Sequence, residues 1–307
     1  MKLAAISVDV DEIGCYTQIH GLTPEPSAEF AIYDKAIPRL ARLFDEEGIP
    51  ATFFAIGEDL DRPEAAEALA KLHAAGHEIA NHSFSHLYDL TRRDRRTIAR
   101  EVEDGAAAIE RAVGERPVGF RAPGYTISNA VFDVLRGLGV EYDSSVFPCP
   151  AYYGAKTAAI GWIRLRSRRS RSVVDDPWVL TAPADPYRVG RPYYRRGDGI
   201  RELPIGVTSA ATGRLPFIGT SVVLAGPKGA RHLTRLAATR EVVSLELHGM
   251  DMADADQDGL RFLAPHQPDL RKTVAEKEAA LRASIDELRR AGYTFVTCRE
   301  AAERSLG

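Results

Sequence analysis

The stretch PATFFAIGEDLDRPEAAEALAKLHAAGHEIAN, residues 50–81, contains one complete strand–helix–strand unit. Residues 50–57 are an apolar run with the length of a buried strand, and residues 63–76 repeat apolar side chains with the period of a helix. A second short apolar run, 77–81, follows the helix. Apolar strands joined through a helix in this way lie parallel in one sheet, and the helix covers the sheet from outside.

The same unit recurs on both sides of this stretch. Further helices are predicted at 32–48, 94–114, 128–138 and 274–292. The predicted strands are 2–10, 50–57, 77–81, 118–123, 140–145, 240–248 and 293–297. About seven βα units favour an α/β fold with a distorted (β/α)7, barrel-like parallel sheet. No glycine-rich fingerprint follows the first strand and no P-loop is present in the sequence, so an open nucleotide-binding sheet is disfavoured.

Composition excludes several classes of protein. Of the 307 residues 45% are hydrophobic, which suits a globular core, and the formal net charge of -3 gives no bias toward nucleic acid. The three cysteines, Cys15, Cys149 and Cys298, are far apart in the sequence, so a disulfide scaffold is disfavoured. A reducing compartment fits this cysteine content better. The first residues become acidic too early for a signal peptide, and no apolar run is long enough to span a membrane. We therefore expect a cytoplasmic protein.

The middle of the chain, about 149–239, differs in character from the rest. It contains an arginine-rich run at 164–171 and an apolar run at 213–226. We expect a single domain over 1–307 in which this segment is an insertion that forms a lid over the sheet. The arginines would then recognise an anionic or lipid-linked group, with peripheral membrane contact as a further possibility. The alternative is that the charge run is simply a solvated face.

Polar side chains follow most of the predicted strands at the point where each strand ends. In a parallel barrel these ends meet at one edge, where the following loops converge on an active site. We therefore expect one site to be formed from the strand-end residues, which are Asp9, Asp11, Asn81, His82, His86, Arg121, Pro123, Gly124, Asp143, His248 and Asp251.

His82 and His86 are four residues apart, a spacing that on a helix places two side chains one turn apart on the same face. Two imidazoles in that arrangement can bind one metal ion, although two surface histidines on a polar turn would have the same spacing. Asp11 completes a set of two histidines and one carboxylate. Such a set binds zinc or another first-row divalent metal and leaves a position open.

The neighbouring residues offer acid and base groups. Asp9 lies on the same side of its strand as Asp11, and a carboxylate beside a metal is a plausible general base. Arg121 would pair with Asp9 and keep it ionised, unless it forms an ion pair with a purely structural role. His248 would protonate a leaving group, unless it is an ordinary core histidine.

The sequences DVD (9–11), HSFSH (82–86), RAPG (121–124) and LH (247–248) together resemble the motifs of the polysaccharide deacetylase, or NodB-homology, family, which is carbohydrate esterase family 4. The resemblance covers 1–145 and 240–300. It implies a distorted barrel with a divalent metal, most often Zn²⁺, with Co²⁺, Ni²⁺, Mn²⁺ or Fe²⁺ as alternatives. The spaced aspartates are similar to a branch that includes intracellular members, among them a lipid-linked arabinose deformylase.

The resemblance also implies a role for each matched residue. Asp9 is the base, and Asp11, His82 and His86 are the metal ligands. Arg121, Pro123 and Gly124 match the third motif, in which the backbone N–H of Gly124 helps to bind the oxyanion. His248 is the general acid.

The fourth motif departs from the family pattern. It normally has an aspartate beside a tryptophan, and the aspartate supports the acid histidine. Here YDSSVFP retains Asp143 but has Val146 and Phe147 near the expected tryptophan. Asp143 or Asp251 is therefore the expected support for His248, and Tyr125 is a further candidate for a supporting or substrate-binding role.

These observations predict a metal-dependent hydrolase that removes an N-acyl group, acetyl or formyl, from an amino sugar or a sugar-containing biosynthetic intermediate. The substrate would be a small molecule or a glycolipid, free, nucleotide-linked or lipid-linked. One alternative is an amidase that acts on a linear or cyclic non-sugar amide, and another is a non-catalytic binding module on the same fold. A two-histidine, one-carboxylate iron oxygenase is a weaker alternative, because its ligand pattern differs.

Overall fold

The computed structural model describes residues 1–23, 25, 28–165 and 170–306. Its strands are β1 (Leu3–Asp9), β2 (Thr52–Ala55), β3 (Glu78–Asn81), β4 (Gly119–Phe120), β5 (Tyr142–Asp143), β6 (Tyr187–Val189), β7 (Arg196–Glu202), β8 (Val242–His248) and β9 (Thr294–Val296). Its α-helices are α1 (Ile13–His20), α2 (Ile37–Glu47), α3 (Pro63–Ala74), α4 (Arg95–Val113), α5 (Asn129–Gly137), α6 (Pro150–Leu165), α7 (Gly219–Ala237), α8 (Val274–Arg290) and α9 (Cys298–Leu306). The fold class predicted from the sequence is confirmed.

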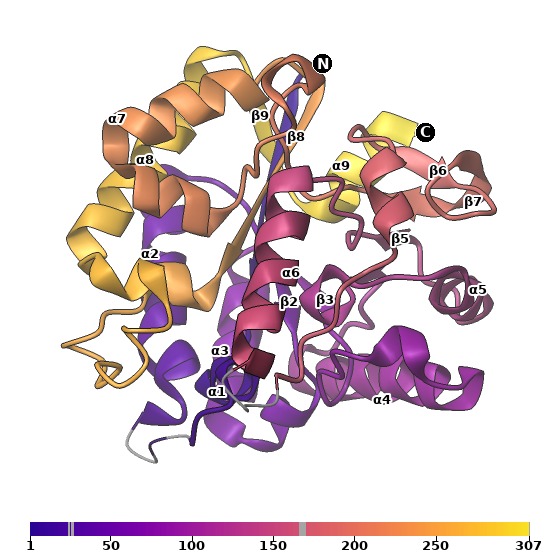
Figure 1. Ribbon diagram of the computed structural model, residues 1–307, viewed down its shortest axis with the longest axis horizontal. Helices are drawn as coiled ribbons and strands as arrows, with labels where there is room; N and C mark the ends of the chain where they lie inside the picture. The colour runs from indigo at the N-terminus through magenta and orange to yellow at the C-terminus, as the bar shows by residue number, and fades with distance from the viewer. Residues whose placement is uncertain (24, 26–27, 166–169, 307) are drawn as a thin grey trace.

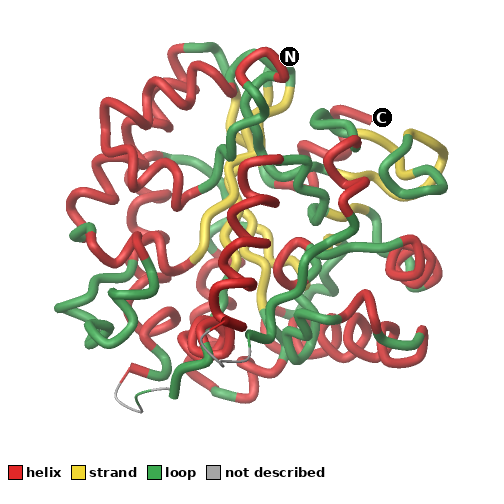
Figure 2. The backbone as a smooth tube through the Cα atoms, in the orientation of Figure 1, coloured by secondary structure: helices red, strands yellow, loops and turns green. Residues whose placement is uncertain are grey.

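The strands form one sheet in the order β6-β7-β5-β4-β3-β2-β1-β8, and β9 also pairs with β1. Every pairing is parallel except β6 with β7. The sheet curls, and the segment 203–218 joins its two ends: Leu203 N–H donates to Asp143 O at 2.8 Å, and Ile218 bridges to Glu246 on β8. The helices lie around this curled sheet (Figures 1 and 2).

Local sequence explains where the predicted helices begin and end. The carboxylate of Asp94 accepts a hydrogen bond from the backbone N–H of Thr97 and so caps the start of α4. The same helix ends at Gly114, whose φ of 81° is left-handed and favours glycine. Thr273 and Glu276 form a capping box at the start of α8. β1 and β2 are buried along their whole length, and α3 and α4 pack against β3.

The range 149–239 divides into parts with different positions. β7 pairs with β5 and so belongs to the sheet, and α7 packs beside α8, where Thr234 Oγ1 donates to Ser284 Oγ at 3.0 Å. α6 stands in front of the strands (Figure 1). β7 was missed because its sequence, RGDGIRE, is polar and partly exposed. A Cβ on its Gly197 would lie 2.5 Å from Gly190 Cα, so close packing in the β6–β7 hairpin requires glycine there.

Within the ranges that the structure describes, every helix is too short or too polar to cross a membrane.

Candidate active site

The predicted polar residues come together at the carboxyl ends of β1, β3, β4 and β8. Asp9, at the end of β1, is the register partner of Phe54 on β2 and of His248 on β8. Asn81, at the end of β3, is the partner of Phe120 on β4. The loops that follow these strands line a cavity of about 210 Å³ that includes Asp9, Asp11, His82, Gly124, Tyr125 and His248.

Asp11 and His82 line this cavity, and together with His86 they form one compact group. Asp11 Oδ1 lies 3.4 Å from His82 Nε2, and Asp11 Oδ2 lies 3.4 Å from His86 Nε2. The candidate ligand atoms of the three residues all lie within 4.8 Å of one another, and all three side chains are buried. The structure therefore brings the predicted metal-ligand set together.

The two histidines do not lie on a helix, so the helical geometry expected from their spacing is wrong. Both follow β3 in a turn in which Ser83 and His86 have left-handed φ values of 67° and 52°. Local hydrogen bonds hold this backbone: Asn81 Oδ1 accepts from Ser83 N–H, and Ser83 Oγ accepts from His86 N–H. The imidazoles of His82 and His86 converge here through a turn. A spacing of four residues alone cannot distinguish such a turn from a helix.

The chemistry of this group fits a divalent metal ion. Asp11 Oδ1, His82 Nε2 and His86 Nε2 are buried and accept or donate no hydrogen bond among the described residues. Such atoms are costly to bury unless a ligand satisfies them. Bonds of about 2.0–2.1 Å to a tetrahedral ion place ligand atoms about 3.3 Å apart, close to the 3.4 Å separations seen here.

Protonation of the two rings is consistent with ligand roles. His82 Nδ1 lies 2.8 Å from the carbonyl oxygen of Arg121, and donation there leaves Nε2 with its lone pair toward Asp11. Burial lowers the pKa of His86 to about 4, against the attraction of Asp11, so this ring is neutral at pH 7. Burial opposes a charge on His82 as well, but Asp9 and Asp11 raise its pKa, since they favour a cation at this place.

Asp9 is bound by Arg121 rather than by the ligand set. Arg121 Nη1 donates to Asp9 Oδ1 at 2.5 Å, and both side chains are almost fully buried. The remaining guanidinium donors reach Ser7 Oγ and Ser144, and Phe54 stacks on the guanidinium with its ring centroid 3.9 Å from Cζ. Asp9 Oδ2 lies 3.8 Å from His82 Nε2, so the carboxylate is oriented toward the metal group without belonging to it.

His248 is paired with Glu246, a residue that the sequence analysis did not select. Glu246 Oε1 lies 2.9 Å from His248 Nδ1, and the carboxylate is fully buried. Burial opposes a charge on His248, but Glu246, followed by Asp11 and Asp9, raises its pKa well above the usual value. The signal was available in LELH, because residues two apart on a strand point to the same side.

Neither the Asp143 nor the Asp251 carboxylate pairs with the His248 ring, whose ion-pair partner among the described residues is Glu246. Asp251 Oδ2 accepts from the backbone N–H of His248 at 2.9 Å, so it holds the main chain instead. Asp143 accepts from the N–H and Oγ of Ser145, whose Oγ in turn accepts from Ala122 N–H. Burial raises the pKa of Asp143. Asp143 therefore supports the RAPG turn. The prediction that Asp143 or Asp251 pairs with the His248 ring is wrong, because the carboxylate that pairs with this ring is Glu246.

Three aromatic rings pack against one another beside His248. Tyr125 contacts Phe147 and Tyr152 at centroid distances of 5.7 and 5.8 Å, and Phe147 contacts Tyr152 at 4.7 Å. Tyr125 Oη also lies 3.4 Å from His248 Nε2. These rings form an aromatic wall beside His248.

Gly124 lies at the same wall with a left-handed φ of 62°. A Cβ at this position would approach Tyr88 Cδ1 to 3.1 Å, so both the backbone conformation and the available space require glycine.

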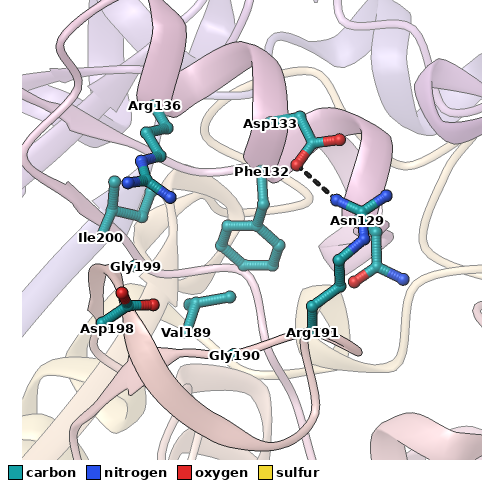
Figure 3. Close-up of a pocket in the computed structure, with 10 residues that line it drawn as sticks. All are labelled: Asn129, Phe132, Asp133, Arg136, Val189, Gly190, Arg191, Asp198, Gly199 and Ile200. Carbon is teal, nitrogen blue, oxygen red and sulfur yellow. Dashed lines mark hydrogen bonds and ion pairs between the residues drawn. The ribbon is translucent and has the colours of Figure 1, made fainter.

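A second cavity, of about 120 Å³, lies between α5 and the β6–β7 hairpin (Figure 3). Arg191 Nη1 donates to Asp133 Oδ1 at its rim, at 2.8 Å. None of the residues that the sequence predicts to be functional lines it. The chemistry-bearing residues are therefore concentrated in the cavity at the strand ends.

Comparisons with known proteins agree with this arrangement. A model of the family described as "Polysaccharide deacetylase" matches residues 31–142, which include both histidines and Arg121. A peptidoglycan deacetylase of Helicobacter pylori is 28% identical over 151 residues, 47% of this chain and 49% of that protein. A peptidoglycan-N-acetylglucosamine deacetylase of Bacillus cereus is 34% identical over 105 residues, 34% of this chain and 47% of that protein. The chain thus spans about half the length of these curated relatives.

Solved structures share the fold. A polysaccharide deacetylase from Mycobacterium smegmatis superposes with a TM-score of 0.58 at 22% identity, covering 99% of this chain and 90% of that one. A carbohydrate esterase family 4 pseudoenzyme from Bacillus anthracis superposes with a TM-score of 0.52 at 13% identity, covering 98% of this chain and 66% of that one. Because the fold also occurs in a pseudoenzyme, activity has to be argued from the site residues.

Proposed function

We propose that this chain, which belongs to the polysaccharide deacetylase family, hydrolyses the N-acyl group of an amino sugar with a divalent metal bound by Asp11, His82 and His86. The observation that carries the proposal is that three groups meet at one cavity, and each contributes at least one residue to its lining. They are the buried ligand set, the Asp9–Arg121 pair and the Glu246–His248 pair. Deacetylases of sugar polymers among the relatives support the substrate class.

A divalent ion in this set supplies Lewis acidity, which polarises an acyl carbonyl and makes water more acidic. Asp9, oriented by its hydrogen bond from Arg121, takes the proton from the attacking water. The backbone N–H of Gly124 donates to the oxyanion of the tetrahedral intermediate, which is the former carbonyl oxygen of the acyl group. His248, kept protonated by Glu246, gives its proton to the departing amine.

The finer features of the substrate belong to the proposal as well. The small aromatic wall suits acetyl or formyl, and the sugar is attached to a biosynthetic intermediate that is free, nucleotide-linked or lipid-linked. Zinc is the preferred metal for a carboxylate and two imidazoles, with the other first-row divalent ions as alternatives. The three cysteines are free thiols, which supports a reducing, cytoplasmic location.

The test is release of the acyl group by protein reconstituted with Zn²⁺ or Co²⁺. N-acetylglucosamine oligomers, N-formylglucosamine and a non-sugar acetanilide are incubated with the protein, and acetate or formate is measured. We expect release from at least one sugar, abolished by a chelator and restored by metal. Release from the acetanilide alone would favour the non-sugar amidase. A protein that binds stoichiometric metal but releases nothing from any substrate would favour a non-catalytic role on this fold.

Glu246→Gln should change the pH dependence of the reaction. The general acid works only while His248 is protonated, so the rate falls as the pH rises through the pKa of His248. Removing the carboxylate charge lowers that pKa, because the imidazolium loses the opposite charge that stabilises it. The alkaline limb of the rate–pH profile should therefore move to lower pH, with a lower rate at pH 8.

The matched control is Glu241→Gln, an exposed residue just before β8. It makes the same charge change outside the cavity and should leave the profile where it is. An unchanged alkaline limb in Glu246→Gln would show that Glu246 does not act on the acid.

A further inference from the structure

We propose that Lys156 on α6 forms a subsite for an anionic group of the substrate, a carboxylate or a phosphate, beside the reacting amide. The proposal rests on the proposed function for the position of the amide. Lys156 lines the same cavity as Asp9, Asp11 and His248. It is the only lysine or arginine among the described residues that line this cavity.

The side chain is held by two contacts that leave donors available. Its Nζ donates to the carbonyl oxygen of Gly124 at 2.7 Å and lies 5.8 Å from the ring centroid of Tyr152. Tyr152 and Lys156 are four apart on α6 and so share one face of the helix. An ammonium group has three N–H donors, and one is used by Gly124.

Lys156 forms no ion pair of 4.0 Å or less among the described residues, whereas Arg121 and His248 each pair with a carboxylate. The buried carboxyl group of Asp175 acts on the charge of Lys156 only from a longer distance. Asp9 is taken by Arg121, and Asp11 belongs to the ligand set. Burial lowers the pKa of Lys156 to about 8, so the amine is still charged at pH 7. A partly buried, unpaired cation is stabilised by an anionic ligand.

The position of Lys156 links this subsite to the reaction. Gly124 is the residue whose N–H is assigned to the oxyanion, and its carbonyl holds Lys156. An anion bound by Lys156 therefore lies on a neighbouring part of the same sugar derivative. The arginine-rich run expected to bind such a group lies mostly outside the described residues, at 166–169, and carries no part of this argument.

The experiment measures binding to the metal-loaded protein by calorimetry. The ligands are N-acetylglucosamine, N-acetylglucosamine 1-phosphate and N-acetylmuramic acid, which share the acetamide and differ in the anionic group. We expect the wild type to bind at least one acidic sugar roughly tenfold or more tighter than the neutral one, as a charge-assisted hydrogen bond allows. Lys156→Met should remove that preference, and Lys156→Arg should keep it. A preference for one acidic sugar over the other identifies phosphate or carboxylate as the anion.

The control is Lys71→Met on α3, an exposed lysine that pairs with Glu67 and does not line the cavity. It changes the net charge equally and should keep the preference. No preference in the wild type, or a preference that persists in Lys156→Met because the anion binds the metal alone, overturns the subsite. Acetate release is measured in parallel: discrimination without any release would overturn the proposed function and leave the subsite standing.

Discussion

Replacing Asp11 or His82 with alanine should remove the bound metal and lower acyl release roughly a thousandfold or more. Each substitution deletes one of three buried ligand residues, and Lewis-acid stabilisation of the transition state is worth several kcal/mol. The measurement is metal content per chain by mass spectrometry, with the acyl-release assay on the same samples. The two losses should occur together in both variants.

His232→Ala is the matched control, because His232 is an exposed histidine on α7 outside the ligand set. It should keep both metal and activity. Thermal unfolding of each variant shows whether a loss reflects the site or the fold. Stoichiometric metal in folded Asp11→Ala and His82→Ala would place the metal elsewhere and remove the basis of the mechanism.

Asp9→Asn should lower the rate by roughly 10²–10⁴-fold while the metal remains bound, since a general base typically contributes that much. Asparagine keeps the shape of the side chain and an oxygen that can accept from Arg121. It cannot take a proton from water. Metal content and acyl release, measured together, separate this variant from the ligand variants.

Asp9→Asn should also destabilise the fold, because it leaves the charge of the buried Arg121 without an anionic partner. Ser7→Ala separates the two effects. Ser7 Oγ accepts a hydrogen bond from Arg121 at 2.9 Å, so its loss weakens the support of the arginine but keeps the base. We expect a lower melting temperature in both variants and a large loss of rate only in Asp9→Asn. Loss of metal in Asp9→Asn would instead make Asp9 a ligand.

The sequence predicted the site well where buried apolar strands are followed directly by polar residues. β1 and β8 are largely apolar runs that end in Asp9 and His248, and β2 is a short apolar run, so both the strands and the edge where they meet were predictable. Asp9 and Arg121 pair as expected, and Asp11 meets both histidines. Parallel strands bring residues together that are far apart in the sequence, and strand ends alone indicate which ones.

The sequence was less informative where side chains play unusual roles. Glu246 was missed because, within an apolar strand, it resembles an ordinary outward-facing residue, yet it is fully buried against His248. The turn at Ser83 and His86 depends on left-handed backbone at non-glycine residues, which has no sequence signature. The role of Phe147 required the positions of Tyr125 and Tyr152, one of which comes from α6.

The direct pairing of Asp9 with His248 across β1 and β8 makes the proposed base and acid neighbours through the backbone itself. Their separation is therefore inherited from strand spacing, which hardly varies among parallel sheets. Tyr152 and Lys156, in contrast, come from a helix that stands apart from the strands and can diverge without disturbing that pairing. Exchange of α6 between relatives should therefore transfer substrate preference, while the spacing of Asp9 and His248 stays constant.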